Sequence, residues 1–509
     1  MAGSIDIPPN FPYLTAILLC PLVAAVIIML TPAQNRLAIR LIAMTGAFLA
    51  LALAILVYLG FDPNATGFQF VQRVDWAPAL GITYHVGIDG ISLAMVLLTA
   101  FIISMGVFAT WTTKHRDKEF YALLLILVTG VFGVFMILDL FFFFLFYEIA
   151  VLPMYLLIGI WGTGNKQYSA MKLTLYLLVG SAFMLIGILA VYFSSGIEPH
   201  TFNLVDLLAV KNHFTPVFAR VVLLMFYIGF GILAGIWPLH TWSPDGHASA
   251  PTAVSMLHAG VLMKLGAYGF LRIGVQLLPG ALPEWAWLIG GIATINIVYG
   301  AFCAMGQSDL KYVIAYSSVS HMGVVMLGIA AADPIALNGA VFQMFAHGIM
   351  TGLFFALVGL VYEKSHTRDM GKMSGFGRKM PGIWLAFTIG GLSSFGLPGT
   401  AGFVAELLVF LGAFRSGNPY LPYFAVISVI GVVVTAAYVL RMLQRIFFGE
   451  VDKKEFGALP DAKTTEWVSL VVLASLLLIF GLFPSLLTGI IAKGLEPIVT
   501  ALGTAVRPL

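Results

Sequence analysis

Three ionisable residues of this sequence lie in the middle of long apolar stretches. Glu148 follows a run of phenylalanines, Lys264 stands midway along an apolar segment, and Glu406 follows a Gly-Leu-Pro-Gly sequence. A charge at the centre of a lipid bilayer costs from about 2.5 to more than 10 kcal/mol, so such a group marks a function or a specific partner. Burial favours a neutral lysine and a nearby carboxylate favours a charged one, so Lys264 can exchange a proton near neutral pH. These residues indicate proton transfer inside a membrane, with structural ion pairs or helix-end contacts as the alternatives.

Five histidines lie in or next to the same apolar stretches. They are His240, His247, His258, His321 and His347. Histidine has an unperturbed pKa near 6.5, so it takes up and releases a proton at little cost. In chain order His321 and His347 fall between Lys264 and Glu406, and we expect them to relay protons between these two residues. His247 is equally well explained as a core residue with satisfied hydrogen bonds.

Two other charges have two interpretations each. Asp139 precedes the phenylalanine run, and we expect it to cap a helix rather than to tune Glu148. Lys172 stands near the start of another apolar stretch and faces either Glu148 or water. For Lys172 both interpretations remain open.

The composition excludes a water-soluble protein. Hydrophobic residues make up 60% of the 509 residues and charged residues 10%, against about 45–50% and about 25% in soluble domains. The basic residues are dispersed between apolar segments, which indicates membrane topology rather than nucleic-acid binding. Cys20 and Cys303 lack the spacing of a metal site, no histidine pair has zinc-protease spacing, and no glycine-rich phosphate loop follows a strand. We therefore expect no cofactor and no metal in this chain.

The apolar stretches predict an all-α membrane protein. A transmembrane helix needs about 20 mostly apolar residues, and the sequence contains about fourteen such stretches. Lysine and arginine are retained on the cytoplasmic side, and their distribution among the short loops predicts that both termini lie outside, on the periplasmic side of a bacterial inner membrane. The expected spans are 11–30, 38–60, 89–111, 119–138, 141–161, 170–195, 217–239, 250–276, 284–306, 310–330, 334–362, 382–413, 421–448 and 466–491.

Two of these spans, the seventh and the twelfth, contain a helix-breaking sequence. Residues 237–240 read Trp-Pro-Leu-His and residues 396–399 read Gly-Leu-Pro-Gly. Proline removes a backbone donor and clashes with the preceding turn, so it opens a helix. Broken helices at matching positions of two halves are typical of inverted repeats with ion sites at the membrane midplane. The expected organisation is a three-helix segment at 1–111, inverted five-helix repeats at 119–276 and 284–448, and a loop with the last helix at 449–509.

Six motifs spread along the chain are specific. They are Gly-Ile-Asp-Gly-Ile-Ser at 87–92, Glu-Ile-Ala-Val-Leu-Pro-Met-Tyr at 148–155, Pro-Leu-His-Thr-Trp-Ser-Pro-Asp-Gly-His at 238–247, Lys-Tyr-Val-Ile-Ala-Tyr-Ser-Ser-Val-Ser-His-Met-Gly at 311–323, Ala-His-Gly at 346–348 and Thr-Arg-Asp-Met at 367–370. With them, nearly the whole chain resembles the antiporter-like membrane subunits of respiratory complex I, and among these the subunit M, or chain 4, type.

The resemblance implies fourteen helices with two inverted half-channels, joined at the midplane by buried polar residues and water. It matches Glu148 to the glutamate of the fifth helix, Lys264 to the lysine of the eighth and Glu406 to the glutamate of the twelfth. Three histidines match residues that line this axis: His240, His321 and His347. The activity implied is proton translocation driven by electron transfer from NADH to quinone. NADH, FMN, iron–sulfur clusters and quinone are then expected in partner subunits, next to neighbouring antiporter-like subunits in the lipid bilayer.

One position departs from the family pattern. The family usually has a lysine on the broken seventh helix, five residues before the proline, where it pairs with the fifth-helix glutamate. This chain has Leu233 there. Either Glu148 stays protonated, or another base replaces the lysine. His258, six residues before Lys264, is the best candidate, because other antiporter-like subunits are similar to this chain in having a histidine at that place.

Two further functions fit parts of this pattern. One is a subunit of a multisubunit sodium/proton antiporter or of a membrane-bound hydrogenase, and the other is a structural relative that has lost transport. Neighbouring genes for subunits with a quinone, NADH or hydrogenase site would distinguish the first from a complex I subunit. Carboxylates and histidines suit protons, and the sequence has no dense set of oxygen ligands for sodium.

Overall fold

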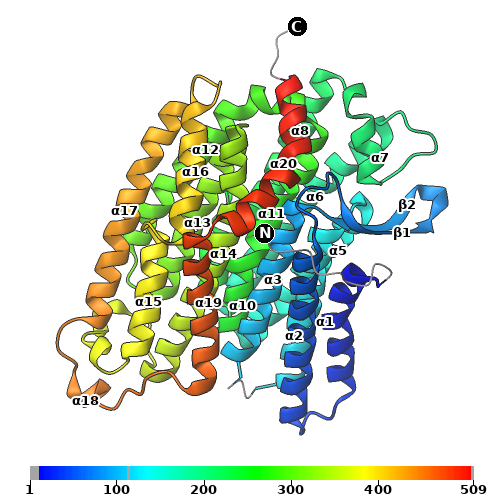
Figure 1. Cartoon of the computed structure of the whole chain (residues 1–509). Helices are drawn as coiled ribbons and strands as arrows, with labels where there is room; N and C mark the ends of the chain where they lie inside the picture. Colours follow the sequence, from blue (N-terminus) through cyan, green and yellow to red (C-terminus); the bar gives the residue numbers. More distant parts are fainter. Residues whose placement is uncertain (1–10, 112–114, 506–509) are drawn as a thin grey trace.

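The computed structural model describes residues 11–111 and 115–505. Within these ranges fourteen helices are long and apolar enough to cross a membrane. They pack side by side into one bundle (Figure 1), which confirms the expected helical membrane protein. The first ten and last four residues, which belong to the expected terminal segments, lie outside the described part.

The elements follow one another in four groups along the chain. The first group is α1 (Tyr13–Leu30), α2 (Arg36–Gly60), β1 (Gln69–Ala77), β2 (Ile82–Ile88) and α3 (Gly90–Ala109). The second is α4 (Asp117–Met136), α5 (Leu140–Trp161), α6 (Lys166–Ser194), α7 (Leu204–Ala209), α8 (Pro216–Ala234), α9 (Trp242–Ser249), α10 (Thr252–Leu257) and α11 (Met263–Gly269). The third is α12 (Leu282–Gly306), α13 (Leu310–Ala330), α14 (Pro334–Ser365), α15 (Pro381–Ser394), α16 (Ala401–Arg415) and α17 (Leu421–Phe447). The last is α18 (Lys453–Phe456), α19 (Thr464–Leu482) and α20 (Ser485–Ala505).

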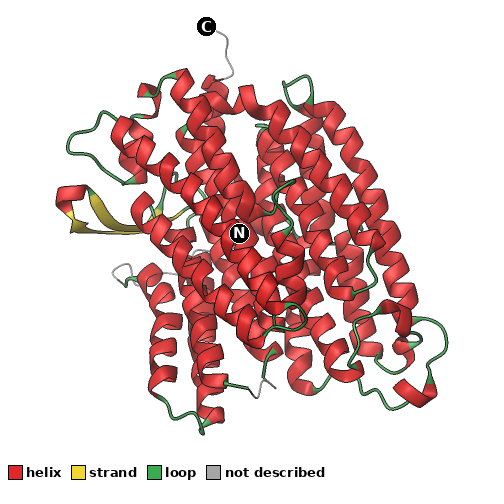
Figure 2. Ribbon diagram, turned by 180° about the vertical axis from the view of Figure 1, so that it is seen from behind, coloured by secondary structure: helices red, strands yellow, loops and turns green. Residues whose placement is uncertain are grey.

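The segment between α2 and α3 forms an antiparallel hairpin of β1 and β2 that the helical pattern did not predict. The hairpin projects from the side of the bundle (Figures 1 and 2). A two-stranded hairpin is marginally stable by itself, and the backbone N–H of Thr83 attaches this one to Asp139 at 2.9 Å. The Asp139 carboxylate also accepts from the backbone N–H groups of Phe141 and Phe142. Asp139 is therefore the cap of α5, as expected.

The two expected helix breaks are present. After α8 the chain passes through Gly235, in the left-handed conformation at φ 74°, before α9 begins at Trp242. The expected span 382–413 consists of the half-helices α15 and α16, and Gly396 between them is also left-handed, at φ 70°. Glycine adopts this conformation without the steric penalty of a side chain. In both breaks a left-handed glycine therefore follows the end of the first half-helix.

The last expected span, 466–491, is wrong as a single helix. The chain forms two helices, α19 and α20, which meet at Phe483 and Pro484. Proline at this point cannot donate the next helical hydrogen bond. The fourteen helices of sufficient length include both α19 and α20 and omit the two short half-helices α15 and α16.

The eighth span is the centre of the bundle. Residues Thr252–Val275 form one continuous span that is completely buried, and it contains two π-helical segments, η3 (His258–Leu262) and η4 (Phe270–Val275). Such segments are rare and are often found at functional sites. The spans α13 and α14, which pack around it, are 94% buried. The central helices therefore cannot present their polar residues to lipid or water.

One end of the bundle gathers the start of α13, the end of α14, the loop before α15 and the segment around α18, and we call it the basic face after Lys311, Lys364, Arg368, Arg378 and Lys454. α13 begins and α14 ends there, because the backbone N–H of Leu310 donates to the carbonyl of Arg368 at 3.0 Å. α18 lies on the same side, at the lower edge of Figure 1.

Candidate functional site

Lys264 lies in the centre of the bundle, on α11, and is fully buried. Its ammonium group donates to the carbonyl of Ala259 and lies 2.7 Å from Nδ1 of His347 on α14. Among the described residues no carboxylate lies within ion-pair distance of it. The hydrogen bond between a lysine and a neutral imidazole is a direct route for a proton, because each nitrogen can carry it.

His347 is the first of two stacked histidines. Its ring centroid is 5.1 Å from that of His321 on α13, with 21° between the ring planes. His321 places Nδ1 2.7 Å from the carbonyl oxygen of Ser317 and Nε2 2.9 Å from that of Ser394. A carbonyl oxygen only accepts, so this geometry suits the imidazolium ion, which has two donors. Both ring nitrogens of His321 therefore face acceptor oxygens.

Glu406 completes this series. One carboxylate oxygen, Oε1, lies 3.6 Å from Nε2 of His321, and the other faces the break before α16, where a Cβ atom added to Gly396 would lie 2.8 Å from it. Glu406 is buried and is the nearest counter-charge for a protonated His321. The structure thus brings four of the expected residues together in one buried series, which we call the central series: Lys264, His347, His321 and Glu406.

Two glycines determine how closely the helices of this series approach. A Cβ atom on Gly348 would lie 2.6 Å from the carbonyl oxygen of Gly260, and one on Gly260 would lie 3.3 Å from that of Gly348. The backbones of α14 and η3 therefore touch beside Lys264 and His347. Side chains at these two positions would separate the helices, so the glycines permit the hydrogen bond between Lys264 and His347.

His258 forms a second pair with His247. The two ring centroids are 3.9 Å apart, and the His258 ring also stacks on Trp242 of α9 at 5.2 Å. Both histidines are fully buried. None of their four ring nitrogens has a protein hydrogen-bond partner among the described atoms. His258 thus faces the broken seventh helix and not lipid.

Glu148 and His240 stand apart from the central series. Glu148 on α5 is partly exposed and lies within hydrogen-bonding reach of Ser181 on α6, with no cation in contact among the described residues. His240, after the first break, packs edge-on against Tyr299 at 5.2 Å. The structure therefore does not connect either residue directly to Lys264.

Lys172 pairs with Asp245 rather than with Glu148, and this ion pair is partly exposed. Its ammonium group lies 2.7 Å from the carboxylate of Asp245 on α9, and Tyr312 donates to the same carboxylate at 3.1 Å. Of the two interpretations of Lys172, the one that pairs it with Glu148 is therefore wrong. The pairing crosses from α6 to α9, two elements that spacing along the chain does not bring together.

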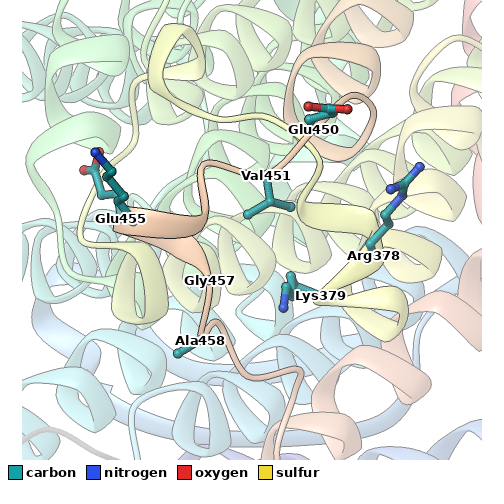
Figure 3. Close-up of a pocket in the computed structure, with 8 residues that line it drawn as sticks. Arg378, Lys379, Glu450, Val451, Glu455, Gly457 and Ala458 are labelled. Atoms are coloured by element: carbon teal, nitrogen blue, oxygen red, sulfur yellow. The ribbon is translucent and has the colours of Figure 1, made fainter.

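A wide hollow of about 710 Å³ lies on the basic face, between the loop before α15 and the segment around α18 (Figure 3). Arg378 and Lys379 line one part of it, and Glu450 and Glu455 line another. The mixed charges face solvent, and no residue of the central series lines the hollow. Among the described residues no group of three or more histidines, cysteines or acidic residues could hold a metal ion.

A bundle of apolar helices with two broken helices and a buried Lys–His–His–Glu series defines a multi-pass membrane protein of the antiporter type. Residues 138–435 match the family described as NADH:quinone oxidoreductase/Mrp antiporter, transmembrane. The chain is 40% identical over 446 residues to NAD(P)H-quinone oxidoreductase chain 4 of Picosynechococcus sp., covering 86% of this chain and 80% of that protein. It is 36% identical to NADH-quinone oxidoreductase subunit M of Rhodobacter capsulatus, with 96% of each covered. The chain belongs to this family and is an antiporter-like membrane subunit of an NAD(P)H-quinone oxidoreductase.

Solved structures share the fold. A chain of respiratory complex I from Thermus thermophilus with bound NADH matches with a TM-score of 0.87 and 28% identity, covering 96% of this chain and 100% of that chain. A chain of the Mrp complex from Dietzia sp. matches with a TM-score of 0.84 at 21% identity, covering 96% and 98%. At that identity the second likeness concerns the fold alone.

Proposed function

We propose that this subunit translocates protons across a bacterial inner membrane and that Lys264 is the pivotal carrier. The observation that carries the proposal is the central series, in which buried groups that bind protons follow one another from Lys264 to Glu406. Burying such groups in a membrane costs several kcal/mol each, so they mark a function. Burial disfavours the charged form of each group, and this makes proton gain or loss between neighbouring groups possible.

In this proposal residues 119–276 and 284–448 act as two inverted repeats. Each contributes one broken helix, and each break contains a left-handed glycine, Gly235 in one and Gly396 in the other. Each break also has a proline, Pro238 or Pro398. Half-helix ends near the membrane midplane are suited to ion binding, and Glu406 lies at the second of them.

The driving reaction takes place in other subunits. The chain itself supplies proton-binding groups, whereas NADH, FMN, iron–sulfur clusters and quinone would be held by partner subunits. Glu148, which is partly exposed, would exchange a proton near the edge of this subunit. His258 and His240 would carry protons within the first repeat, residues 119–276. Neighbouring antiporter-like subunits would complete the path, with both termini of this chain on the periplasmic side.

The test is Lys264→Ala in the assembled complex. We expect NADH:quinone activity coupled to proton pumping to fall at least about tenfold in membrane vesicles, which is about 1.4 kcal/mol on the transfer barrier. Lys211→Ala, in the loop after α7, is the control and should behave as wild type. Normal pumping by the assembled Lys264→Ala complex would refute the proposed function.

A further inference from the structure

Two cations lie at the C-terminal end of α9, close to the basic face. Nζ of Lys311 donates to the carbonyl oxygen of Ala250 at 2.5 Å, and Nη1 of Arg368 donates to that of Ala248 at 2.9 Å. The charge of Arg368 is compensated by Asp309, with Nε and Oδ2 3.3 Å apart. Among the described residues no carboxylate lies within ion-pair distance of Lys311.

Lys311 is also buried, although it is the second residue of α13 and close to the basic face. A buried ammonium group with a carbonyl as its hydrogen-bond acceptor is costly, because nothing cancels its charge. In the sequence Lys311 opens one of the specific motifs, but its place at the end of an apolar stretch indicates membrane topology rather than a buried charge. Its burial shows that it is not a solvated loop lysine.

The nearest neighbours of Lys311 continue toward the centre. Ser255 donates its hydroxyl to the carbonyl oxygens of both His247 and Ala250, and Lys311 donates to the same Ala250 oxygen, so Lys311 holds the turn that follows His247. His247 in turn contacts His258, with ring centroids 3.9 Å apart, and His258 stands six residues before Lys264 on the same buried span. The four ionisable residues thus lead from the basic face to the centre of the bundle, through α13, α9, η3 and α11.

The histidine pair has the properties of a proton relay. Buried polar groups normally have hydrogen-bond partners, yet none of the ring nitrogens of His247 and His258 has one among the described protein atoms. Buried nitrogens of this kind are usually satisfied by ordered water. The two rings are in contact, so water at their edges would join the ring nitrogens into a hydrogen-bonded path.

We propose that protons reach Lys264 from the basic face through Lys311 and the His247–His258 pair. The ammonium group of Lys311 gives a proton to His247, and the amine that remains takes another from the aqueous side. His247 passes the proton to His258, and His258 passes it to neutral Lys264. Each histidine returns to its neutral form, and no other bond is made or broken. This route rests on the proposed function of Lys264. It also supplies a proton-binding group in place of the family lysine, whose position is occupied here by Leu233.

The alternative role of Lys311 is purely structural. A cation at a helix C-terminus stabilises the last carbonyl groups and the helix dipole, and Lys311 meets this description at α9. Arginine distinguishes the two roles. It keeps the positive charge and the donors, but it does not release a proton in proteins.

The experiment compares Lys311→Arg with Lys364→Arg in the assembled complex in vesicles. Lys364 is a suitable control because it is also buried near the basic face, where it pairs with Glu466 at 2.9 Å away from the relay. We expect Lys311→Arg to assemble and to lose proton pumping by about tenfold, while Lys364→Arg pumps normally. Normal pumping by an assembled Lys311→Arg complex would show that Lys311 is only a helix cap.

A second variant keeps the test decisive if Lys311→Arg does not assemble. His247→Phe preserves an aromatic ring against Phe355, which stacks on His247 at 5.3 Å, but removes both ring nitrogens. Assembled His247→Phe should pump as poorly as Lys264→Ala. If His247→Phe pumps normally while Lys264→Ala does not, the route is wrong and the proposed function stands. If Lys264→Ala itself pumps, the proposed function fails first.

Discussion

At the scale of single residues, the two halves of the site use different chemistry. In the central series His321 has two carbonyl acceptors and a carboxylate, Glu406, within 3.6 Å. Lys264 and the His247–His258 pair have no carboxylate in contact among the described residues. A positive charge on the imidazole would therefore have a counter-charge at the Glu406 end and none in contact at the other end.

The histidine pair leads to a prediction about the missing lysine. His258→Ala should depress proton pumping nearly as strongly as Lys264→Ala, because the path from His247 to Lys264 then crosses an apolar gap. Leu233→Lys should be tolerated, and it should partly restore pumping to the His258→Ala complex. Leu233 is fully buried on α8, and α8 packs directly on α11, where a Cβ on Gly266 would lie 2.4 Å from the carbonyl oxygen of Phe230.

The measurement is the initial rate of proton uptake by vesicles, divided by the rate of NADH oxidation. His213→Ala, which removes an exposed histidine after α7, is the control. A fully active His258→Ala complex would mean that the first half does not use this histidine and that Glu148 is supplied by water alone.

At the scale of elements, the approach of α14 to η3 positions the site. A methyl group on Gly348 would come within 2.6 Å of the carbonyl oxygen of Gly260, which is too close for any real contact. The two helices would have to separate. A shift of this kind acts on Lys264 and His347 together, since they lie next to the contact and their hydrogen bond spans it.

Gly348→Ala should therefore weaken both stability and pumping. Overpacking of this kind costs about 1–3 kcal/mol, so the melting temperature of the purified complex should fall, and pumping should fall more than NADH oxidation does. Gly489→Ala in α20 is the matched control, because nothing lies within 4 Å of a Cβ at that position. Identical melting and pumping of the two variants would contradict this account of the helix contact.

At the scale of the whole molecule, the buried central helices are enclosed by more exposed ones. The spans Thr252–Val275, α13 and α14 are almost wholly inside, whereas more than half of the residues of α2, α6 and α17 are at least partly exposed. The outer helices are apolar enough to face lipid, and the inner ones hold the polar residues. This arrangement lets a chain with 10% charged residues keep ionisable groups away from lipid.

The orientation of the molecule is tested with cysteines in a Cys20→Ser, Cys303→Ser background. Asn212→Cys, exposed in the loop before α8, should react with an impermeant maleimide added to spheroplasts. Lys454→Cys, exposed on α18, should react only in inverted vesicles, because basic loops stay in the cytoplasm. The reverse pattern of labelling would mean that the termini lie inside.

The sequence by itself determined the helical class, the positions of the two breaks and two of the buried charges, Lys264 and Glu406. A bilayer accepts only long apolar helices, prolines interrupt them, and Glu148, Lys264 and Glu406 are conspicuous in such surroundings. The β1–β2 hairpin and the division of the last span at Pro484 were not predicted. A search for long apolar stretches detects neither short strands nor a single proline near the end of a span.

Only the tertiary structure decided which of these residues meet. The contact of Lys264 with His347, the partner of Lys172 and the burial of Lys311 all join elements far apart in the chain. Such contacts depend on which face each helix turns inward and on how closely the backbones approach, as at Gly260 and Gly348. Nearly uniform apolar helices carry little periodic signal for that choice, so the pairing is settled by packing and not by local sequence.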